Sequence, residues 1–322
     1  MKSLGDAIEL RNRLIANLEE ANFECSSAAR KRLLTFVVAG AGFAGVETVA
    51  AMNDFVRDVV RFYPQLSSGM VRMVLVDPGD AILPECGRSL GHYAERKLAK
   101  RQIEIKLNCK VTGVSERMVE LSDGTTVESS TLIWTAGTAP NPLLETLPCR
   151  SERGRIAVNE FMEVPGYPGV WALGDCAAVP DPKTGKPQPP TAQHALREGK
   201  VVAENIEAAL RGGPKKAFSF STIGQLAAIG RRTGVANILG IHFSGIVAWW
   251  LWRTIYLLKL PRLEKKVRVA LDWTLDVFFS KDFVQYLHET QLLVVNTPIA
   301  NSGAEPVPVR GGLVDIRGGA GA

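Results

Sequence analysis

A glycine-rich turn between an apolar strand and a helix is the feature that most constrains the fold of this chain. The pattern G-x-G-x-x-G begins at Gly40, follows the apolar run 33–39 and opens a helical pattern. This is the dinucleotide-binding fingerprint in the context that it requires. Gly40 permits the tight turn, Gly42 lets a pyrophosphate approach the backbone, and Gly45 lets the helix pack on the strand. A glycine-rich turn in another α/β fold is the plainer alternative.

The residues around this turn alternate between strand and helix patterns, which predicts an α/β domain at about 32–140. The expected strands are 33–39, 71–76, 103–107, 110–114, 118–121, 126–128 and 131–134, and the expected helices are 45–62 and 89–100. A loop-rich second region, 141–230, contains an expected helix at 191–210.

A second apolar run, Val170–Asp175, is expected to be a strand that ends in Gly-Asp. Flavoproteins use that ending for the ribityl chain of the flavin. A flavin fold opens with a G-x-G-x-x-G of its own, and none precedes Gly40. The sequence therefore predicts a two-nucleotide flavoenzyme without its first flavin-binding unit. Residues 1–31 are then a remnant of the flavin domain with a connector helix.

The composition argues against several classes of protein. A chain of 322 residues with 46% hydrophobic residues suits two packed domains. Its five cysteines include no C-x-x-C pair, which argues against a disulfide framework, a zinc site and a dithiol flavin reductase, and favours a reducing compartment. Residues 1–21 follow helical spacing and predict an amphipathic helix rather than a signal peptide.

The positive charge of the chain is concentrated near the C-terminus. Residues 253–268 carry a net charge of +5, equal to that of the whole chain. Four of the six tryptophans lie in or beside this stretch, at Trp249, Trp250, Trp252 and Trp273. Because the basic residues adjoin apolar runs, a membrane surface is favoured over nucleic acid as the partner.

The stretch 235–260 is the most apolar and is expected to be a helix that ends at Pro261. It is a borderline spanning helix, since spanning needs about 20 clean apolar residues. We expect it to lie in the membrane interface, with a buried core helix or a dimer contact as the alternative. An amphipathic helix at 265–287 completes a membrane-associating region, 231–288, and the tail 289–322 is expected to be disordered.

Two acidic residues near the glycine turn are candidates for cofactor contacts. Asp77 closes the next strand and can accept hydrogen bonds from an adenosine ribose. Its carboxylate repels the extra phosphate of NADPH, so NADH is preferred; a solvated strand-end aspartate is the alternative. Glu47 is expected in the first helical turn, where it either acts beside a bound pyrophosphate or only begins the helix favourably.

A third candidate group opens the helix at 191–210. Gln193 can hydrogen-bond a carbonyl of a flavin or a quinone, and the helix N-terminus can support a reduced flavin ring. His194 and Cys176 are expected to be packing residues.

These motifs together resemble type II NADH dehydrogenase, the single-subunit NADH:quinone oxidoreductase that binds FAD and does not pump protons. The matching stretches are 38–47 (VAGAGFAGVE), 132–137 (LIWTAG), 170–177 (VWALGDCA), 189–195 (PPTAQHA) and 248–253 (AWWLWR). The resemblance covers about residues 1–287. It implies an α/β flavoprotein with two dinucleotide-binding domains, in which a Rossmann-like NADH domain is inserted in an incomplete FAD domain, followed by C-terminal membrane-associated helices.

The resemblance also implies the site residues. Those that bind NADH and FAD are then Gly40, Gly42, Phe43, Ala44, Gly45, Asp77, Ala136, Gly137, Gly174, Asp175, Ala192 and Gln193. Glu47 and Gln193 are the catalytic pair, with Glu47 near the nicotinamide–flavin junction, and Gln193 and Arg197 contact the quinone. Arg197 departs from the family, whose quinone motif A-Q-x-A-x-Q ends in Gln. No metal is expected.

The expected protein is a monotopic membrane-associated homodimer, on the cytoplasmic face of the inner membrane if the organism is bacterial. One rival is a non-catalytic NADH-binding, membrane-attached remnant, which the absent first loop favours. Another is a different flavin-dependent pyridine nucleotide oxidoreductase, such as a sulfide:quinone type. That chemistry needs redox cysteines close to the flavin, and the cysteines here are scattered in sequence.

Overall fold

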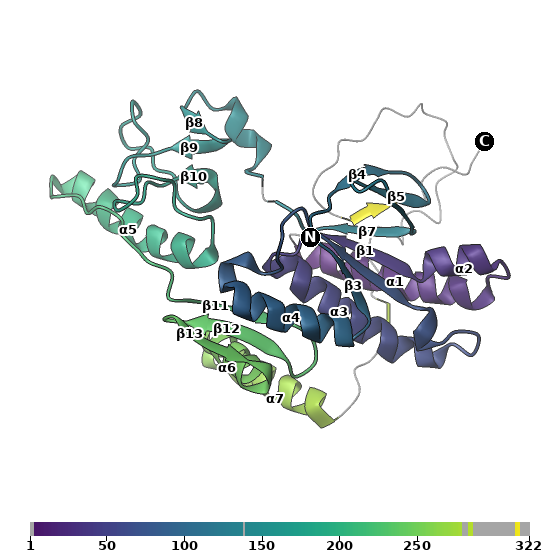
Figure 1. The fold of residues 1–322 in the computed structure, drawn as a ribbon. Helices are drawn as coiled ribbons and strands as arrows, with labels where there is room; N and C mark the ends of the chain where they lie inside the picture. The colour runs from purple at the N-terminus through teal and green to yellow at the C-terminus, as the bar shows by residue number, and fades with distance from the viewer. Residues whose placement is uncertain (1–2, 138, 279–282, 286–312, 316–322) are drawn as a thin grey trace, which may run out of the picture. The chain divides into compact units, whose positions relative to one another are not determined.

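The computed structural model describes residues 3–137, 139–278, 283–285 and 313–315 (Figure 1). The chain divides into two compact units. Unit 1 combines residues 1–136 with 224–322, and unit 2 is the segment 137–223. The boundaries expected from the sequence lie at 140 and 230, whereas β11 (Gly224–Ala228), which falls within the expected second region, belongs to unit 1.

Unit 1 is built on a sheet with the strand order β14–β7–β1–β2–β3. Its parallel strands are β1 (Thr35–Ala39), β2 (Arg72–Val76), β3 (Ile103–Lys106) and β7 (Thr131–Trp134), and β14 (Leu313–Asp315) runs antiparallel to β7. The strands expected from the sequence between 33 and 134 are thus confirmed. Because β1 lies between β2 and β7, the glycine turn that follows it lies in the middle of the sheet edge.

Alternate side chains of this sheet enter two different cores, as the period of a strand requires. On one face, Phe36, Val38 and Met73 pack with α1 (Leu4–Phe23), α3 (Phe43–Val59) and α4 (Arg88–Lys100). On the other face, Val37, Val74 and Leu132 pack with the antiparallel strands β4 (Val111–Val114), β5 (Met118–Leu121) and β6 (Thr126–Glu128). Figure 1 shows these layers.

The amphipathic helix expected at the N-terminus is confirmed as α1. Its apolar face, with Leu10, Leu14 and Leu18, is buried in the core that α3 and the sheet share. A short helix, α2 (Ser27–Leu33), leads from α1 into β1. The remaining connections include 3-10 turns at Val60–Phe62, Ser68–Met70, Pro84–Cys86 and Pro142–Thr146.

The expectation of a single helix over 235–260 is wrong for its first part. β11, β12 (Gly234–Ile238) and β13 (Ile241–Ser244) form an antiparallel sheet, and only α6 (Gly245–Lys259) is helical. Gly240 has φ +83° in the turn between β12 and β13, a conformation that ends regular helix. Among the described residues, no helix combines the length and the hydrophobicity that crossing a bilayer requires.

The expected helix at 265–287 begins earlier, as α7 (Leu263–Phe278). Between 278 and 288, the structure describes only 283–285, and they are not helical. Of the tail expected to be disordered, 289–322, only 313–315 are described; they form β14, so the expectation is wrong there.

Unit 2 contains a small sheet and one long helix. The sheet has the order β10–β9–β8, with β8 (Ser151–Glu152), β9 (Arg155–Ala157) and β10 (Ala177–Ala178), and the helix is α5 (Ala192–Arg211). The strand expected at Val170–Asp175 is wrong, because Trp171 forms only an isolated bridge with Glu163 and a 3-10 turn, Gly174–Cys176, follows. Left-handed glycines at 169 and 174, with φ of +79° and +68°, bound the extended part on both sides.

Candidate functional site

The glycine-rich turn joins β1 to α3, and Gly40 makes the turn possible. Gly40 has φ +106° and donates its N–H to the Val76 carbonyl at 2.8 Å. A Cβ at this position would lie 2.7 Å from the backbone nitrogen of Ala136. The turn therefore requires glycine for its backbone angle and for its space.

Gly45 and Gly42 have opposite surroundings. A Cβ at Gly45 would lie 1.6 Å from the Gly40 carbonyl oxygen, so α3 packs directly on the turn. At Gly42, the N-cap of α3, no described atom lies within 4 Å of the Cβ position, and no described side chain caps the helix. Phe43 is half-buried in the core and Ala44 is exposed beside this open end. An open, uncapped helix N-terminus is the arrangement that receives a phosphate.

Asp77 lies at the end of β2, directly beside the turn. Its Oδ2 accepts a hydrogen bond from the Ala41 amide at 2.6 Å, and its Oδ1 accepts one from the Gly79 amide at 2.7 Å. The long connection between α3 and β2 does not displace Asp77, because Ala39 and Val76 pair in register. Each carboxylate oxygen has a second lone pair, which can accept from a ribose hydroxyl.

Thr135 supports the turn from β7, although sequence reasoning did not select it. Its hydroxyl donates to the Ala39 carbonyl at 2.7 Å, and its amide donates to the same carbonyl at 2.9 Å. The signal was present, since a small hydroxyl residue precedes Ala136 in the Thr-Ala-Gly stretch. Gly137, the first residue of unit 2, has φ +72°.

Glu47 lies beyond the first turn of α3, because the helix begins at Phe43; its expected place in the first turn is wrong. Its Oε1 accepts a hydrogen bond from the Ala228 amide of β11 at 2.9 Å. Burial raises the pKa of Glu47, while the Ala228 N–H and the nearby Trp252 indole lower it. The Trp252 Nε1 atom is buried, and it has no hydrogen-bond partner among the described residues. Glu47 therefore joins α3 to the C-terminal sheet through the Ala228 amide.

Burial around Glu47 also affects two neighbouring groups. Burial raises the pKa of the Cys86 thiol to about 12, with smaller contributions from the charges of Glu85 and Glu47. Burial and the charge of Glu47 raise the pKa of Tyr256. Glu47 is thus partly withdrawn from solvent, in contrast to the open helix N-terminus at Gly42.

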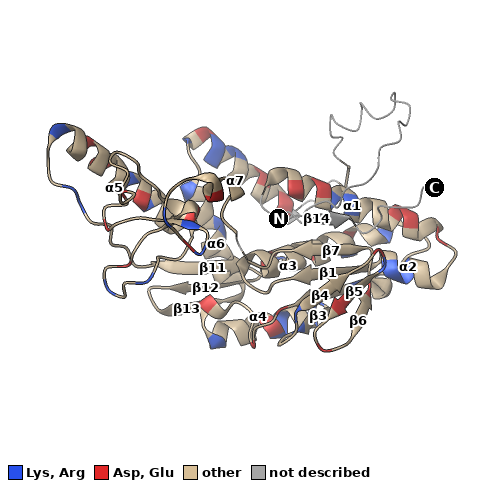
Figure 2. Cartoon of the chain, turned by 90° about the horizontal axis from the view of Figure 1, so that it is seen from above, with Lys and Arg blue, Asp and Glu red and all other residues tan. Residues whose placement is uncertain are grey.

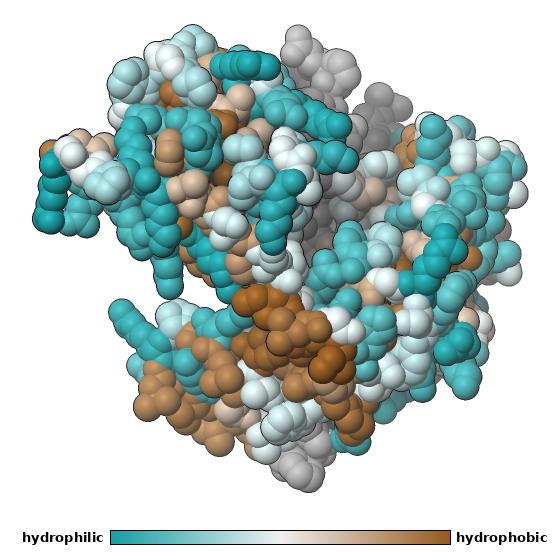
Figure 3. Space-filling model, turned by 60° about the vertical axis from the view of Figure 1, so that its left-hand side comes forward, coloured by the Kyte–Doolittle hydropathy of each residue, from teal (hydrophilic) through white to brown (hydrophobic). Residues whose placement is uncertain are grey.

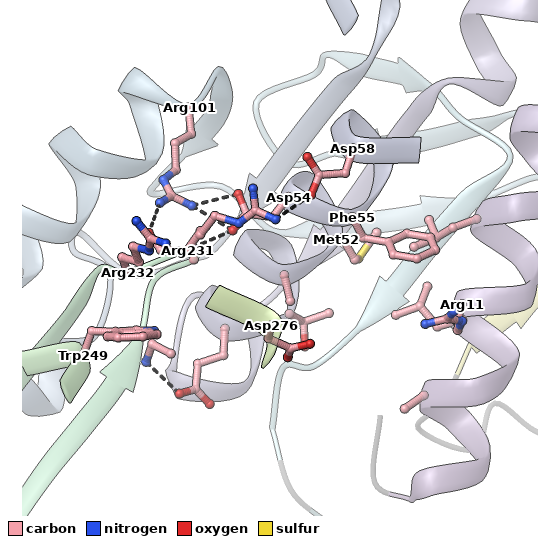
Figure 4. A pocket seen from close by; sticks show the side chains of 18 of the residues that line it. Arg11, Met52, Asp54, Phe55, Asp58, Arg101, Arg231, Arg232, Trp249 and Asp276 are labelled. Atoms are coloured by element: carbon pink, nitrogen blue, oxygen red, sulfur yellow. Dashed lines mark hydrogen bonds and ion pairs between the residues drawn. The ribbon is translucent and has the colours of Figure 1, made fainter. Parts of the chain in front are cut away.

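A cavity of 1240 Å³ extends from Glu47 along α3 (Figure 4). Its lining comes from α1, α3, the β11–β12 turn, α6 and α7 and mixes arginines and acids with aromatic rings. The Arg253 guanidinium lies over the rings of Trp249 and Trp273, 4.5 and 4.8 Å from their centroids. Sequence reasoning missed this cavity, because its walls come from segments far apart in the chain.

In unit 2, a buried carboxylate holds the Gly-Asp turn. The Gly174 amide donates to Glu198 Oε2 at 2.6 Å, and Asp175 is exposed in the same turn. Burial raises the pKa of Glu198, the Gly174 N–H lowers it, and the charge of Asp175 raises it. Sequence reasoning missed Glu198, although it follows His194 by four residues on the buried face of α5.

The N-terminal turn of α5 brings the other predicted residues of unit 2 close to Gly174, whose Cβ position lies 3.4 Å from the Ala195 Cβ. Ala192 is exposed and Gln193 is half-buried. The Arg197 guanidinium donates to the Gln193 carbonyl at 2.8 Å and lies 4.0 Å from the centroid of the Phe220 ring.

His194 is buried within unit 2, and burial lowers its pKa. Its Nδ1 lies 2.8 Å from the Thr191 hydroxyl, and its ring meets Phe220 edge-on. Cys176 packs at the edge of the same core. The two residues occupy the packing positions expected of them.

The predicted site residues therefore form two groups. In unit 1, the turn from Gly40 to Gly45 gathers Asp77 and Ala136, and Glu47 lies further along α3. In unit 2, Gly174 lies against the start of α5.

Comparison with known proteins places this geometry in a family. Residues 6–199 match the family model of the pyridine nucleotide-disulphide oxidoreductases, and the chain belongs to that family. Residues 223–282 match the model of the NDH2 C-terminal domain. Through this second match, the chain is similar to the type II NADH dehydrogenases.

Individual relatives agree with this assignment. The chain is 34% identical over 287 residues to the type II NADH:quinone oxidoreductase Ndh of Mycobacterium tuberculosis, with 85% of this chain and 61% of the relative covered. It is 30% identical to a probable NADH dehydrogenase of Dictyostelium discoideum, with 89% and 64% covered. The chain thus spans about three fifths of the length of these curated relatives.

A solved structure of NDH2 from Plasmodium falciparum in complex with NADH has the same fold. It matches with a TM-score of 0.79 at 18% sequence identity and covers 88% of this chain and 74% of that chain. At this identity the likeness shows the fold alone.

Proposed function

We propose that the protein passes electrons from NADH to a membrane quinone through FAD, without pumping protons. The open, uncapped N-terminus of α3 at Gly42, with Asp77 beside it, is the observation that carries this proposal. It fits the pyrophosphate and the adenosine ribose of NADH. The names of the relatives support the reaction.

Unit 1 is proposed to bind NADH. Gly40 and Gly45 shape the turn, Gly42 admits the pyrophosphate, and Asp77 accepts from the ribose. Phe43, Ala44 and Ala136 flank this site, and Gly137 follows it in sequence. Glu47 is proposed to act near the nicotinamide.

Unit 2 is proposed to hold part of FAD and the quinone. Asp175 is exposed on a turn fixed by Gly174 and suits the ribityl chain, while Ala192 and Gln193 at the start of α5 suit the flavin ring. When bound, FAD accepts a hydride from NADH and supplies two electrons to the quinone. Arg197 is proposed to donate a hydrogen bond to a quinone oxygen. Its guanidinium is held over the Phe220 ring, 4.0 Å from the ring centroid.

Attachment to a membrane surface is proposed through α6 and α7. Exposed apolar side chains recur along α7 at every fourth position, at Leu263, Val267, Leu271 and Leu275. Basic residues also lie on α7 (Figure 2). Hydrophobic residues gather in a patch on the face of the molecule that Figure 3 shows. Apolar and basic groups on one helix favour a monotopic position in the interface. A homodimer, on the cytoplasmic face of the inner membrane if the organism is bacterial, completes this proposal.

The test is the visible absorbance spectrum of the purified chain, before and after anaerobic addition of NADH. A flavin spectrum that bleaches supports the proposal, and turnover with a soluble quinone is then measured. A colourless protein that binds NADH in a titration contradicts the flavin step and leaves a nucleotide-binding protein. Cosedimentation with anionic vesicles, with and without residues 235–287, tests the membrane surface.

A further inference from the structure

Three carboxylates of α3 meet the same β-hairpin. Glu47, Asp54 and Asp58 are spaced by seven and four residues, which places them on one face of the helix. Glu47 accepts from the Ala228 amide, Asp54 accepts from the Arg231 amide at 2.6 Å, and Asp58 pairs with the Arg231 guanidinium at 2.9 Å. The β11–β12 hairpin is thus docked on α3 at both ends of this acidic face.

Asp54 and Arg101 hold one residue of the hairpin turn from two sides (Figure 4). Asp54 Oδ2 accepts from the Arg231 amide, and Arg101 Nη2 donates to the Arg231 carbonyl at 2.8 Å. Asp54 and Arg101 also pair with each other at 2.8 Å, with side chains 29% and 21% exposed. Both backbone polar groups of Arg231 are therefore fixed by this partly buried ion pair.

Gly230 lets the ion pair approach the turn closely. It has φ +100°, and a Cβ there would lie 1.8 Å from Arg101 Nη1 and 2.9 Å from Asp54 Oδ2. The guanidinium and the carboxylate thus occupy the space that any larger residue would need. Ala228, whose amide is the donor to Glu47, precedes Gly230 by only two positions in the chain.

We propose that Asp54 and Arg101 are positioning residues, which fix the β11–β12 turn so that the Ala228 amide holds the Glu47 carboxylate. The inference rests on the proposed function, in which Glu47 acts near the nicotinamide. In this role the two residues act through the position of the Ala228 amide and not through contact with a cofactor.

The groups that face Glu47 determine how its pKa changes when the β11–β12 turn moves. They are the Ala228 amide of β11, Trp252 and Tyr256 of α6, and Cys86 before α4. Of these, the Ala228 N–H gives the largest opposition to the effect of burial on the pKa of Glu47. If the turn moves, this donor is lost, and Glu47 must titrate at higher pH than in the unaltered protein.

The experiment compares Asp54→Ala with the matched control Asp58→Asn. In the control, the carboxylate that is lost pairs with the Arg231 side chain, which is 59% exposed, and the two hydrogen bonds of the Arg231 backbone to Asp54 and Arg101 remain. Carbon-13 NMR of labelled glutamate carboxyls follows Glu47 against pH, with its signal assigned by Glu47→Gln. Asp54→Ala is expected to raise the midpoint by about half a pH unit or more. The control is expected to leave it unchanged.

NADH affinity gives a second readout. Asp54→Ala is expected to weaken NADH binding roughly three- to tenfold, the loss of about one hydrogen bond. An unmoved Glu47 midpoint in a folded Asp54→Ala protein overturns the inference. If Asp54→Ala does not fold, Arg101→Lys is measured in its place. This variant keeps the positive charge but cannot donate to Asp54 and to the Arg231 carbonyl at the same time as the guanidinium does. Absence of NADH binding in the unaltered protein contradicts the proposed function alone, because the NMR midpoint needs no ligand.

Discussion

Each unit places a left-handed glycine at a candidate nucleotide site, but the two turns are held by different means. Gly40, with φ +106°, is fixed by its hydrogen bond to the Val76 backbone in a sheet of parallel strands of four or five residues. Gly174, with φ +68°, lies beside strands of two or three residues, and the acceptor for its amide is the buried side chain of Glu198. At Gly174 the sheet is too short to supply an acceptor, so the titratable carboxylate of Glu198 supplies it. At Gly40 the acceptor is a backbone carbonyl, and a carboxylate, that of Asp77, meets only the next amide, that of Ala41.

The strongest test of the backbone-held turn is Gly45→Ala. The added Cβ would lie 1.6 Å from the Gly40 carbonyl, so the helix must move away from the turn. We expect a loss of about 3 kcal/mol or more in the free energy of unfolding of unit 1. Urea denaturation, with hydrogen exchange to locate the effect, measures it; a loss confined to unit 2 would contradict the comparison.

The side-chain-held turn is broken by Glu198→Ala, which leaves the Gly174 amide without its acceptor. We expect unit 2 to lose about 2 kcal/mol, the usual cost of an unsatisfied polar group of this kind. Glu198→Gln keeps an acceptor oxygen and serves as the matched control, with a smaller loss. Hydrogen exchange within 137–223 reports the change, and equal losses in the two variants would argue against the hydrogen bond as the cause.

The pH dependence of the two turns should also differ. Burial raises the folded-state pKa of Glu198 above its unfolded value, so its contribution to stability is fully present below the unfolded pKa and declines as pH rises through the folded pKa. Glu198→Gln should remove this decline, which amounts to about 1.4 kcal/mol for each unit of pKa shift. Thermal unfolding of both proteins from acid to neutral pH measures it. Parallel stability curves would show that Glu198 does not titrate differently on folding.

Gly42→Ala should have the smallest effect on stability, because the Cβ enters open space at a residue with φ −71°. We expect the free energy of unfolding to fall by about 1 kcal/mol or less, because alanine is a poorer N-cap than glycine. NADH affinity should fall roughly tenfold, since the methyl group crowds the pyrophosphate. A fluorescence titration with NADH checks this, and unchanged affinity would count against the assignment of Gly42.

Sequence periodicity was sufficient for the four parallel strands of the unit 1 sheet, because these strands and the glycine turn repeat the pattern of a dinucleotide fold. It did not predict β14, which lies in the tail expected to be disordered. It was not sufficient for 234–244, since an apolar β-hairpin and an apolar helix can have the same composition, and the turn glycine, Gly240, is the local signal that separates them. Glu198 could have been found from its place on the buried face of α5. The pairing of Asp54 with Arg101, and of Arg101 with Arg231, spans 47 and 130 residues, and no local pattern announces it.

Asp77 has a consequence for attempts to redesign coenzyme preference. The carboxylate that is proposed to bind the ribose also accepts hydrogen bonds from the Ala41 and Gly79 amides, one on each oxygen. Replacing it with a small or basic residue to admit a 2′-phosphate would remove both acceptors from the turn. A switch toward NADPH therefore has to begin with a substitute acceptor for Ala41, or the redesigned protein will lose the turn before it gains the new coenzyme.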